Sequence, residues 1–250
     1  MFEKNEAILN LVKLLNLESK FNNDEDLESK SFPLYNKLQQ PQDEDKEVFI
    51  SQKMNLIKRI KPSENEFKQF NFYKIVNIEV QKREDSFLKQ YLPKWKQSQF
   101  RLLYQAQVHG FSPKQFHELC DNRGPTVTFY LSKQGKTFGI YAYKSWESPQ
   151  KAFFQIDLEL FVFQLDHRTV HKQINKGEKL QYLNKSYFPS AGNIYEFDIS
   201  TIQGVITGQT SSFGKSFDVQ NIQKRVRSNQ NYLGGSSSFE FLEIEVYSFN

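Results

Sequence analysis

The chain has 250 residues, a formal net charge of +4 and one cysteine, Cys120, which excludes an internal disulfide and favours a reducing compartment. No window approaches 18 uninterrupted apolar residues, so we expect no membrane-spanning helix, and no secretory signal pattern is visible at the N-terminus. The 24 Phe and 12 Tyr, in short segments punctuated by Gly, favour sheet packed on sheet over a helical bundle.

The charge is uneven along the chain. Residues 18–47 hold nine acids against four lysines, a balance of −5, which leaves +9 on the rest. A basic body suits an anionic membrane or a nucleic acid, but a solvated surface is the commoner reason for such a balance. No helix carries a Lys/Arg stripe and no RNA-reading motif occurs, so we expect no nucleic-acid partner.

The N-terminal part predicts an extension in front of one folded domain. Residues 1–17 form an amphipathic helix with its apolar stripe at Ile8, Leu11, Val12 and Leu15, and this helix has to dock on its own domain or on a partner. Residues 18–47 form an acidic linker. Residues 48–86 connect it to the domain at 87–250, with a short helix at Val48–Ile60 and, from its β-branched and aromatic composition, a first strand at Phe67–Val80.

The domain opens with Phe87–Tyr91 as a short helix, followed by a strand, helix and strand between Phe100 and Tyr130. LLYQA predicts the first of these strands. Ser112 before Pro113 fits an N-cap with proline at the first helical position, and Phe116 lies on the apolar face of that helix. Gly124-Pro125 ends the helix, and TVTFY predicts the next strand.

Later segments predict more short strands. Thr137–Tyr143 contains Gly139 as a bulge or close-packing position, and the apolar segments Ala152–Phe154 and Leu158–Leu165 are expected to be central. A polar turn covers Lys172–Leu180, and strands follow at Asn193–Ile199 and Phe213–Val219. Leu233–Ser238 is a Gly/Ser loop. FEFLEIEVY then alternates strictly, placing Leu242, Ile244 and Val246 on one buried face and Phe241, Glu243, Glu245 and Tyr247 on the other.

Glu243 and Glu245 are the first candidates for chemistry. Two residues apart on one strand, their carboxylates emerge roughly 7 Å apart on the same face, a spacing compatible with acid–base catalysis. An exposed polar strand face is commoner, and hydrogen bonding to loop backbone amides is the role that we favour.

Cys120 and two histidines offer weaker candidates. Cys120 lies in the last turn of its helix, where the helix dipole disfavours a thiolate, and no second cysteine exists to resolve a sulfenic acid, so a buried small side chain is expected. His167 and His171 have metal-compatible spacing only on a helix, and they follow a predicted strand. No phosphate-binding glycine loop or nucleophile elbow occurs, so we expect no cofactor, no metal and no enzymatic activity.

Several of these segments together resemble a TLDc domain. LLYQAQVHGFSPKQFHELCDNRGPTVT is similar to the family's opening pattern of LLY, GFS, FH, C and GPT, and includes His117. Further pieces follow in the same order over Phe87–Phe249: Phe138-Gly139 with Ser145-Trp146, Ala152–Phe154 with Leu160–Phe163, Ser212–Gly214 with Phe217-Asp218, Asn231–Gly234, and Phe241–Val246.

The resemblance implies an α+β, mainly β fold, with two packed antiparallel sheets flanked by short helices. It also implies a non-enzymatic interaction module that binds the peripheral, ATP-hydrolysing sector of the vacuolar-type proton ATPase, with links to oxidative-stress protection. The expected localisation is cytoplasmic, including the periphery of endomembranes. The alternative is a structural subunit of a large assembly, anchored by the N-terminal extension.

Overall fold

The computed structural model describes residues 63–193, 196–201, 207–210, 213–219 and 229–250. The chain divides into two units, Met1–Ser63 and Glu64–Asn250, and the second is described here by itself. The predicted helices at 1–17 and at Val48–Ile60 and the acidic linker at 18–47 lie outside the described residues. No helix in the described part is long and apolar enough to cross a membrane.

Short helices and many strands make up the described unit. The helical elements are α4 (Glu64–Val80), η3 (Leu88–Gln90), α5 (Ala106–His109), α6 (Pro113–Cys120) and η4 (Asn229–Asn231). The strands are β1 (Phe100–Gln105), β2 (Thr126–Ser132), β3 (Thr137–Ala142), β4 (Phe153–Ile156), β5 (Phe161–Gln164), β6 (Thr169–Lys172), β7 (Lys179–Leu183), β8 (Ser190–Asn193), β9 (Glu196–Thr201), β10 (Thr207–Gln209) and β11 (Ser238–Phe249).

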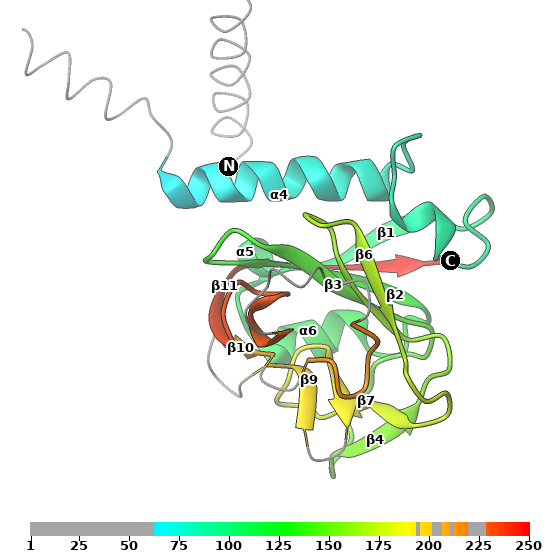
Figure 1. Cartoon of the computed structure of the whole chain (residues 1–250). Coiled ribbons are helices and arrows are strands. Elements are labelled where there is room, and N and C mark those ends of the chain that lie inside the picture. The colour runs from blue at the N-terminus through cyan, green and yellow to red at the C-terminus, as the bar shows by residue number, and fades with distance from the viewer. Residues whose placement is uncertain (1–62, 194–195, 202–206, 211–212, 220–228) are drawn as a thin grey trace, which may run out of the picture. The chain divides into compact units, whose positions relative to one another are not determined.

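The strands form two antiparallel sheets, as the sequence predicted. One sheet has the order β1-β11-β2-β3-β5-β6 and the other the order β4-β7-β8-β9. The short strand β10 pairs with β9 and with β11, so it joins the two sheets into one continuous ladder (Figure 1). The long strand β11 therefore lies at the centre of the fold, with partners on both of its edges.

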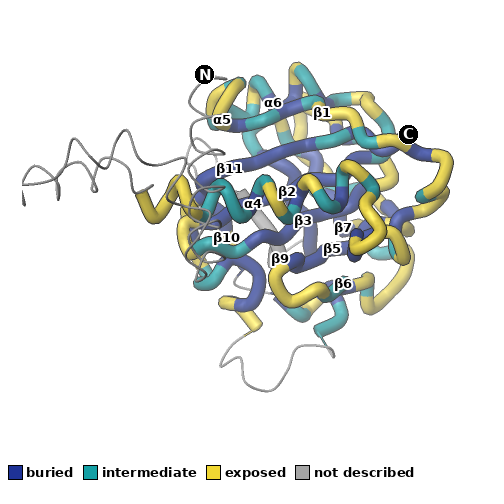
Figure 2. The backbone as a smooth tube through the Cα atoms, turned by 90° about the horizontal axis from the view of Figure 1, so that it is seen from above, coloured by how far each residue is buried: buried dark blue, intermediate teal, exposed yellow. Residues whose placement is uncertain are grey.

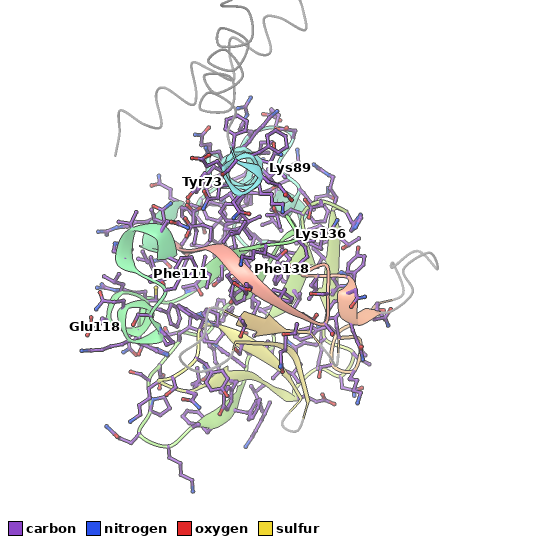
Figure 3. All side chains as sticks on the ribbon, turned by 90° about the vertical axis from the view of Figure 1, so that its left-hand side faces the viewer. Tyr73, Lys89, Phe111, Glu118, Lys136 and Phe138 are labelled. Carbon is purple, nitrogen blue, oxygen red and sulfur yellow. The ribbon has the colours of Figure 1, made fainter. Side chains whose placement is uncertain are left out.

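The sheet that contains β11 is buried on both faces, which creates two hydrophobic cores. The first core lies between the sheets and includes Tyr130, Phe138 and Ile244. The second lies under α4 and η3 and includes Phe72, Phe129 and other residues from the opposite face. Figure 3 looks along α4 and shows the helix above the strands, with Phe138 deep among the layers below it.

The helix α4 replaces the predicted strand at Phe67–Val80, which is a wrong prediction. Phe72, Val76 and Glu79 follow i, i+4, i+7 spacing, and all three are buried. Figure 2 shows α4 crossing over the buried strands β2 and β3, so its β-branched and aromatic side chains pack as one face of a helix. Burial against the sheet outweighs their intrinsic preference for strands.

Glu79 connects α4 to the start of the domain proper. Its carboxylate accepts hydrogen bonds from the backbone N–H groups of Phe87 and Leu88, both at 2.9 Å, while the side chain is only 2% exposed. These bonds satisfy donors at the beginning of η3, which confirms the short helix predicted at Phe87–Tyr91. The turn after α4 is therefore part of the core and does not act as a loose connector.

The predicted strand, helix and strand at the opening of the domain are confirmed as β1, α6 and β2. Ser112 occupies the N-cap with extended backbone and Pro113 follows it, although the serine hydroxyl makes no capping hydrogen bond. The predicted end at Gly124-Pro125 is wrong. The helix stops at Cys120, with Asp121 as its C-cap and Asn122 at φ 58°, because an Asn can adopt the left-handed conformation that reverses the chain.

Other strands agree with the sequence in part. β3 is confirmed, and Gly139 marks close packing, because an added Cβ would lie 2.0 Å from the Thr128 carbonyl oxygen. β5 is an inner strand as predicted, but β4 is an edge strand with exposed ends and was wrongly expected to be central. Residues 213–219 form turns with one isolated bridge, Gln173↔Phe217, instead of the predicted strand.

The strict alternation predicted for β11 is broken by a bulge. The register with β2 shifts between Phe241 and Glu243, so Leu242 packs in the core under α4, whereas Ile244 and Val246 pack between the sheets. Placing Leu242 on one face with Ile244 and Val246 was therefore wrong. The prediction of only one buried face was also wrong, since α4 covers the other one.

Candidate functional site

A group of buried polar side chains lies on β11, beneath α4. Glu243 is 0% exposed and Glu245 is 4% exposed, so the expectation of an exposed polar strand face is wrong for both. Tyr73 from α4 donates a hydrogen bond to Glu243 at 2.6 Å. Gln105, the last residue of β1, donates to Glu245 at 3.0 Å and lies 3.4 Å from Glu243, so its amide lies between the two carboxylates.

Backbone groups complete the set of donors to Glu243. The N–H of Gln107 in α5 donates to it at 3.1 Å, and the N–H of Ile244 donates at 2.9 Å. Backbone amides therefore do bond to Glu243, but they belong to α5 and β11, so the expectation that they would lie in a loop is wrong. Glu245 instead accepts a hydrogen bond at 2.9 Å from the hydroxyl of Tyr247, its neighbour on the same face.

Burial changes the acidity of this carboxylate cluster, which we define as Glu243, Glu245, Tyr73, Gln105 and Tyr247. Burial raises the pKa of Glu245 to about 7, the Tyr247 hydroxyl opposes the shift, and the charge of Glu243 adds to it. Burial also raises the pKa of Glu243 against the lowering effect of its donors. The pKa values of Tyr73 and Tyr247 rise by burial first and by the nearby carboxylates second, so both phenols stay protonated donors.

The cluster has little access to an external substrate. Both carboxylates are nearly inaccessible, and each accepts hydrogen bonds that tie α4, β1, α5 and β11 together. The role of this arrangement is structural: its polar contacts attach α4 to the sheet. The sequence pointed to Glu243 and Glu245 but missed Tyr73, Gln105 and Gln107, which come from elements that local patterns did not connect to β11.

The motif residues of α6 form a second group, on the side of the first core. Phe116 and Cys120 are fully buried, and Trp146 packs near Phe116 with its indole N–H donating to Thr126 at 2.9 Å. Burial, the largest cause, raises the pKa of the Cys120 thiol, so the expected inert, buried role of this side chain agrees with its surroundings.

His117 connects α6 to a distant loop. Its Nδ1 lies 2.7 Å from Asp121 Oδ1, and its Nε2 lies 3.0 Å from the carbonyl oxygen of Asn184 and 3.1 Å from that of Tyr187. Only the first of these contacts is local to α6. The contacts to 184–187 join α6 to the segment between β7 and β8.

The remaining motif residues secure backbone segments. Gly124 donates its N–H to Ser145 Oγ at 3.0 Å, and Pro125 accepts from the N–H of Phe249 at 2.9 Å. Gly234 has the ring of Phe239 so close that an added Cβ would lie 2.2 Å from it. Gly214 lies in the turn that follows Phe213.

His171 is held in a hydrogen-bonded chain. Its Nδ1 donates to the carbonyl oxygen of Asp218 at 2.7 Å, and its Nε2 lies 3.0 Å from Thr169 Oγ1, which contacts the Tyr232 hydroxyl at 2.8 Å. Burial lowers the pKa of His171, which favours the neutral ring. His167 stacks on Tyr232 in the turn before β6, so the two histidines do not share a helix, and both nitrogens of His171 are already in use.

An exposed groove runs along β6, the edge strand of the sheet. It consists of two cavities of about 250 and about 100 Å³ that share Tyr91 and Lys172. We call this feature the β6 groove; its walls also include Arg168, Val170 and Asp218 at one end, and Leu158, Glu159, Gln173 and Lys176 at the other. Cationic, acidic and apolar side chains therefore line one accessible surface.

The comparison with known families agrees with this architecture. The TLDc domain model matches residues 73–250, which is more than half of the chain. The chain therefore belongs to the TLDc domain family, and the match begins within α4, ahead of the boundary predicted at Phe87. The antiparallel sheets and the motif residues described above lie within the matched range.

Individual relatives are similar over a shorter stretch. The chain is 34% identical over 104 residues to the MTOR-associated protein MEAK7 of Xenopus laevis, covering 40% of this chain and 21% of the relative. It is 32% identical over 101 residues to the same-named protein of Danio rerio, covering 40% and 22%. The matched stretch thus spans about a fifth of the length of these curated relatives.

Proposed function

We propose that this chain is a non-enzymatic protein-interaction module that binds the peripheral, ATP-hydrolysing sector of the vacuolar-type proton ATPase and modulates its assembly or activity in the cytoplasm. Membership of the TLDc family is the observation that carries the proposal. The burial of Glu243, Glu245 and Cys120 supports a role without catalysis, because these reactive groups serve the interior of the domain. A link to oxidative-stress protection would then act through the bound assembly and not through thiol chemistry.

The β6 groove is the surface that suits a protein contact best. Lys172 and Lys176 are exposed and make no ion pair within the described residues, so they are free to meet carboxylates of a partner. Leu158 is 57% exposed beside them and supplies an apolar contact.

A capture experiment with the full chain tests both the binding of the proton pump and the role of the β6 groove in it. The wild-type chain is used as bait in cell extract, alongside Lys172→Glu/Lys176→Glu and a control pair, Lys74→Glu/Lys96→Glu, which changes the net charge equally at exposed positions elsewhere. We expect pump subunits on the wild-type and control baits and their loss from the groove variant. Absence of pump subunits from the wild-type bait would reject the function, whereas equal capture by all baits would reject only the groove.

The similarity to MEAK7 favours a second candidate partner. The relatives carry the name of MTOR-associated proteins, and their similarity to this chain extends over about 100 residues. The same captured material therefore distinguishes the two partners. Enrichment of mTOR on the wild-type bait without pump subunits would replace the leading proposal with association to an mTOR-containing complex.

A further inference from the structure

Ser148 stands in a highly accessible loop of the described unit. All residues from Glu147 to Phe153 are exposed except Pro149, which is partly buried, and Ser148 makes no hydrogen bond to any described residue. The loop is fixed at its base, because the carbonyl oxygen of Trp146 accepts a hydrogen bond from Asn122 at 3.0 Å. An enzyme can therefore reach Ser148 without unfolding the domain.

The residues around Ser148 carry a second, independent signal. Pro149 follows the serine directly, and Lys151 lies three residues after it. This order, Ser-Pro-x-Lys, is the substrate pattern of proline-directed serine/threonine kinases of the cyclin-dependent class. The chain contains one other Ser-Pro pair, Ser112-Pro113. The residue three positions after that serine is Gln115, which is not basic.

The surface beside Ser148 suits a phosphoryl group. Ser148 lines a cavity of about 390 Å³ together with Lys114, His117 and Glu118 of α6 and with Lys185 and Ser186 of the β7–β8 segment. Lys185 is exposed and has no ion-pair partner among the described residues, and Lys114 is only 3.8 Å from Glu118 in an exposed pair. Two ammonium groups from separate segments thus line the same cavity as the Ser148 hydroxyl, and only an exposed pair with Glu118 competes for one of them.

We propose that Ser148 is a phosphorylation site whose phosphoryl group is held by Lys114 and Lys185. In the transfer, Ser148 Oγ attacks the γ-phosphorus of ATP, the bond from that phosphorus to the bridging oxygen breaks to leave ADP, and the serine proton passes to the catalytic aspartate of the kinase. The phosphoserine carries about −1.5 to −2 charges and three strong acceptors. Charge-assisted hydrogen bonds to both lysines then tie the loop, α6 and the β7–β8 segment to one another.

The phosphoserine contacts would add to a connection between α6 and the β7–β8 segment that His117 already makes. His117 already joins α6 to the carbonyl oxygens of Asn184 and Tyr187. Phosphorylated Ser148 would add a charged bridge between the same two segments within the cavity that His117 also lines. Such a bridge would regulate this surface whichever partner the domain binds.

To test this proposal, the folded full-length chain is incubated with ATP and a cyclin-dependent kinase. The phosphorylated residues are then mapped by mass spectrometry. We expect incorporation at Ser148, with loss of most of it in Pro149→Ala. Ser112 serves as the control within the chain, because Pro113 already begins α6 and Ser112 is only partly exposed. An unmodified Ser148 would overturn the proposal, as would equal labelling of Ser112, which would show that the kinase acts on unfolded chain.

The lysine contacts are tested separately by thermal unfolding. Phosphorylation should raise the melting temperature by about 3 °C at low salt, and by less at high salt. The increase should disappear in Lys114→Ala/Lys185→Ala, whose side chains are exposed enough to leave the unmodified fold intact. Phosphorylation at Ser148 that leaves the melting temperature unchanged, or raises it equally in the double variant, would refute the role of the two lysines.

Discussion

Replacing Glu245 by Gln should remove much of the pH dependence of folding stability in the neutral range. In the folded chain, burial raises the pKa of Glu245 from 4.5 to about 7. The folded state therefore binds a proton that the unfolded state releases between these two values. Stability is highest below the unfolded pKa and falls as the pH rises through the folded pKa, because a buried carboxylate then has to ionise.

The magnitude follows from the size of this shift. A displacement from 4.5 to about 7 is about 2.5 pKa units, which at about 1.36 kcal/mol per unit corresponds to about 3 kcal/mol as an upper value. The substituted glutamine would resemble the protonated acid in shape and remain neutral. Burial also raises the pKa values of Glu243 and Asp157, so the variant should keep part of the slope.

Urea unfolding followed by tryptophan fluorescence provides the measurement, since Trp146 is 2% exposed. The wild type should lose up to about 3 kcal/mol of unfolding free energy between about pH 5 and about pH 8, and Glu245→Gln should lose clearly less. Glu240→Gln is the matched control, because Glu240 lies on the same strand with its side chain 52% exposed. Equal slopes in the wild type and Glu245→Gln would refute the assignment of a buried, protonated Glu245.

Three further variants or reactions test the packing. Tyr73→Phe removes the 2.6 Å hydrogen bond to Glu243 but keeps the ring, and should cost about 1–3 kcal/mol in urea unfolding; no change would show that α4 is not held by this contact. Gly139→Ala would place a Cβ 2.0 Å from the Thr128 carbonyl oxygen and should cost at least about 1–3 kcal/mol, so a wild-type melting temperature would contradict the packing of β3. Cys120, at 0% exposure, should react with a thiol reagent only as fast as the chain unfolds, whereas rapid modification under native conditions would contradict its burial.

The parts of the fold that were predictable depend on local chemistry. Ser112 with Pro113 marks the start of α6, and the β-branched and aromatic run Thr126–Ser132 forms β2, because caps, prolines and strand propensities act within a few residues. The end of α6 was less predictable, since Asn122 and Gly124 both adopt positive φ, and the hydrogen bond from Asn122 to the Trp146 carbonyl oxygen is a tertiary contact that supports the earlier turn.

The candidate site was predictable only in part, for a different reason. Glu243 and Glu245 share a face of β11, as their spacing indicated, but their environment depends on α4, whose Tyr73 lies 170 residues away from Glu243 in the chain. The aromatic composition of α4 resembles that of a strand, so no local pattern indicated a helix that covers the sheet. If no helix is expected above the sheet, an alternating strand with two glutamates predicts one solvent-exposed face.

The position of α4 on the sheet and the presence of two glutamates on β11 therefore depend on each other. A central strand buried on both faces would ordinarily carry apolar side chains on both, yet β11 presents Glu243 and Glu245 to the core beneath α4. These carboxylates are stable there because Tyr73, Gln105 and the N–H of Gln107 donate to them, and because Glu245 can retain its proton. The polar contacts fix one register for α4 on the sheet, which apolar packing alone specifies less sharply. The match of the family model from residue 73 onward accords with α4 being part of the domain, and a truncation at Phe87 would remove Tyr73 and leave Glu243 without its shortest hydrogen bond.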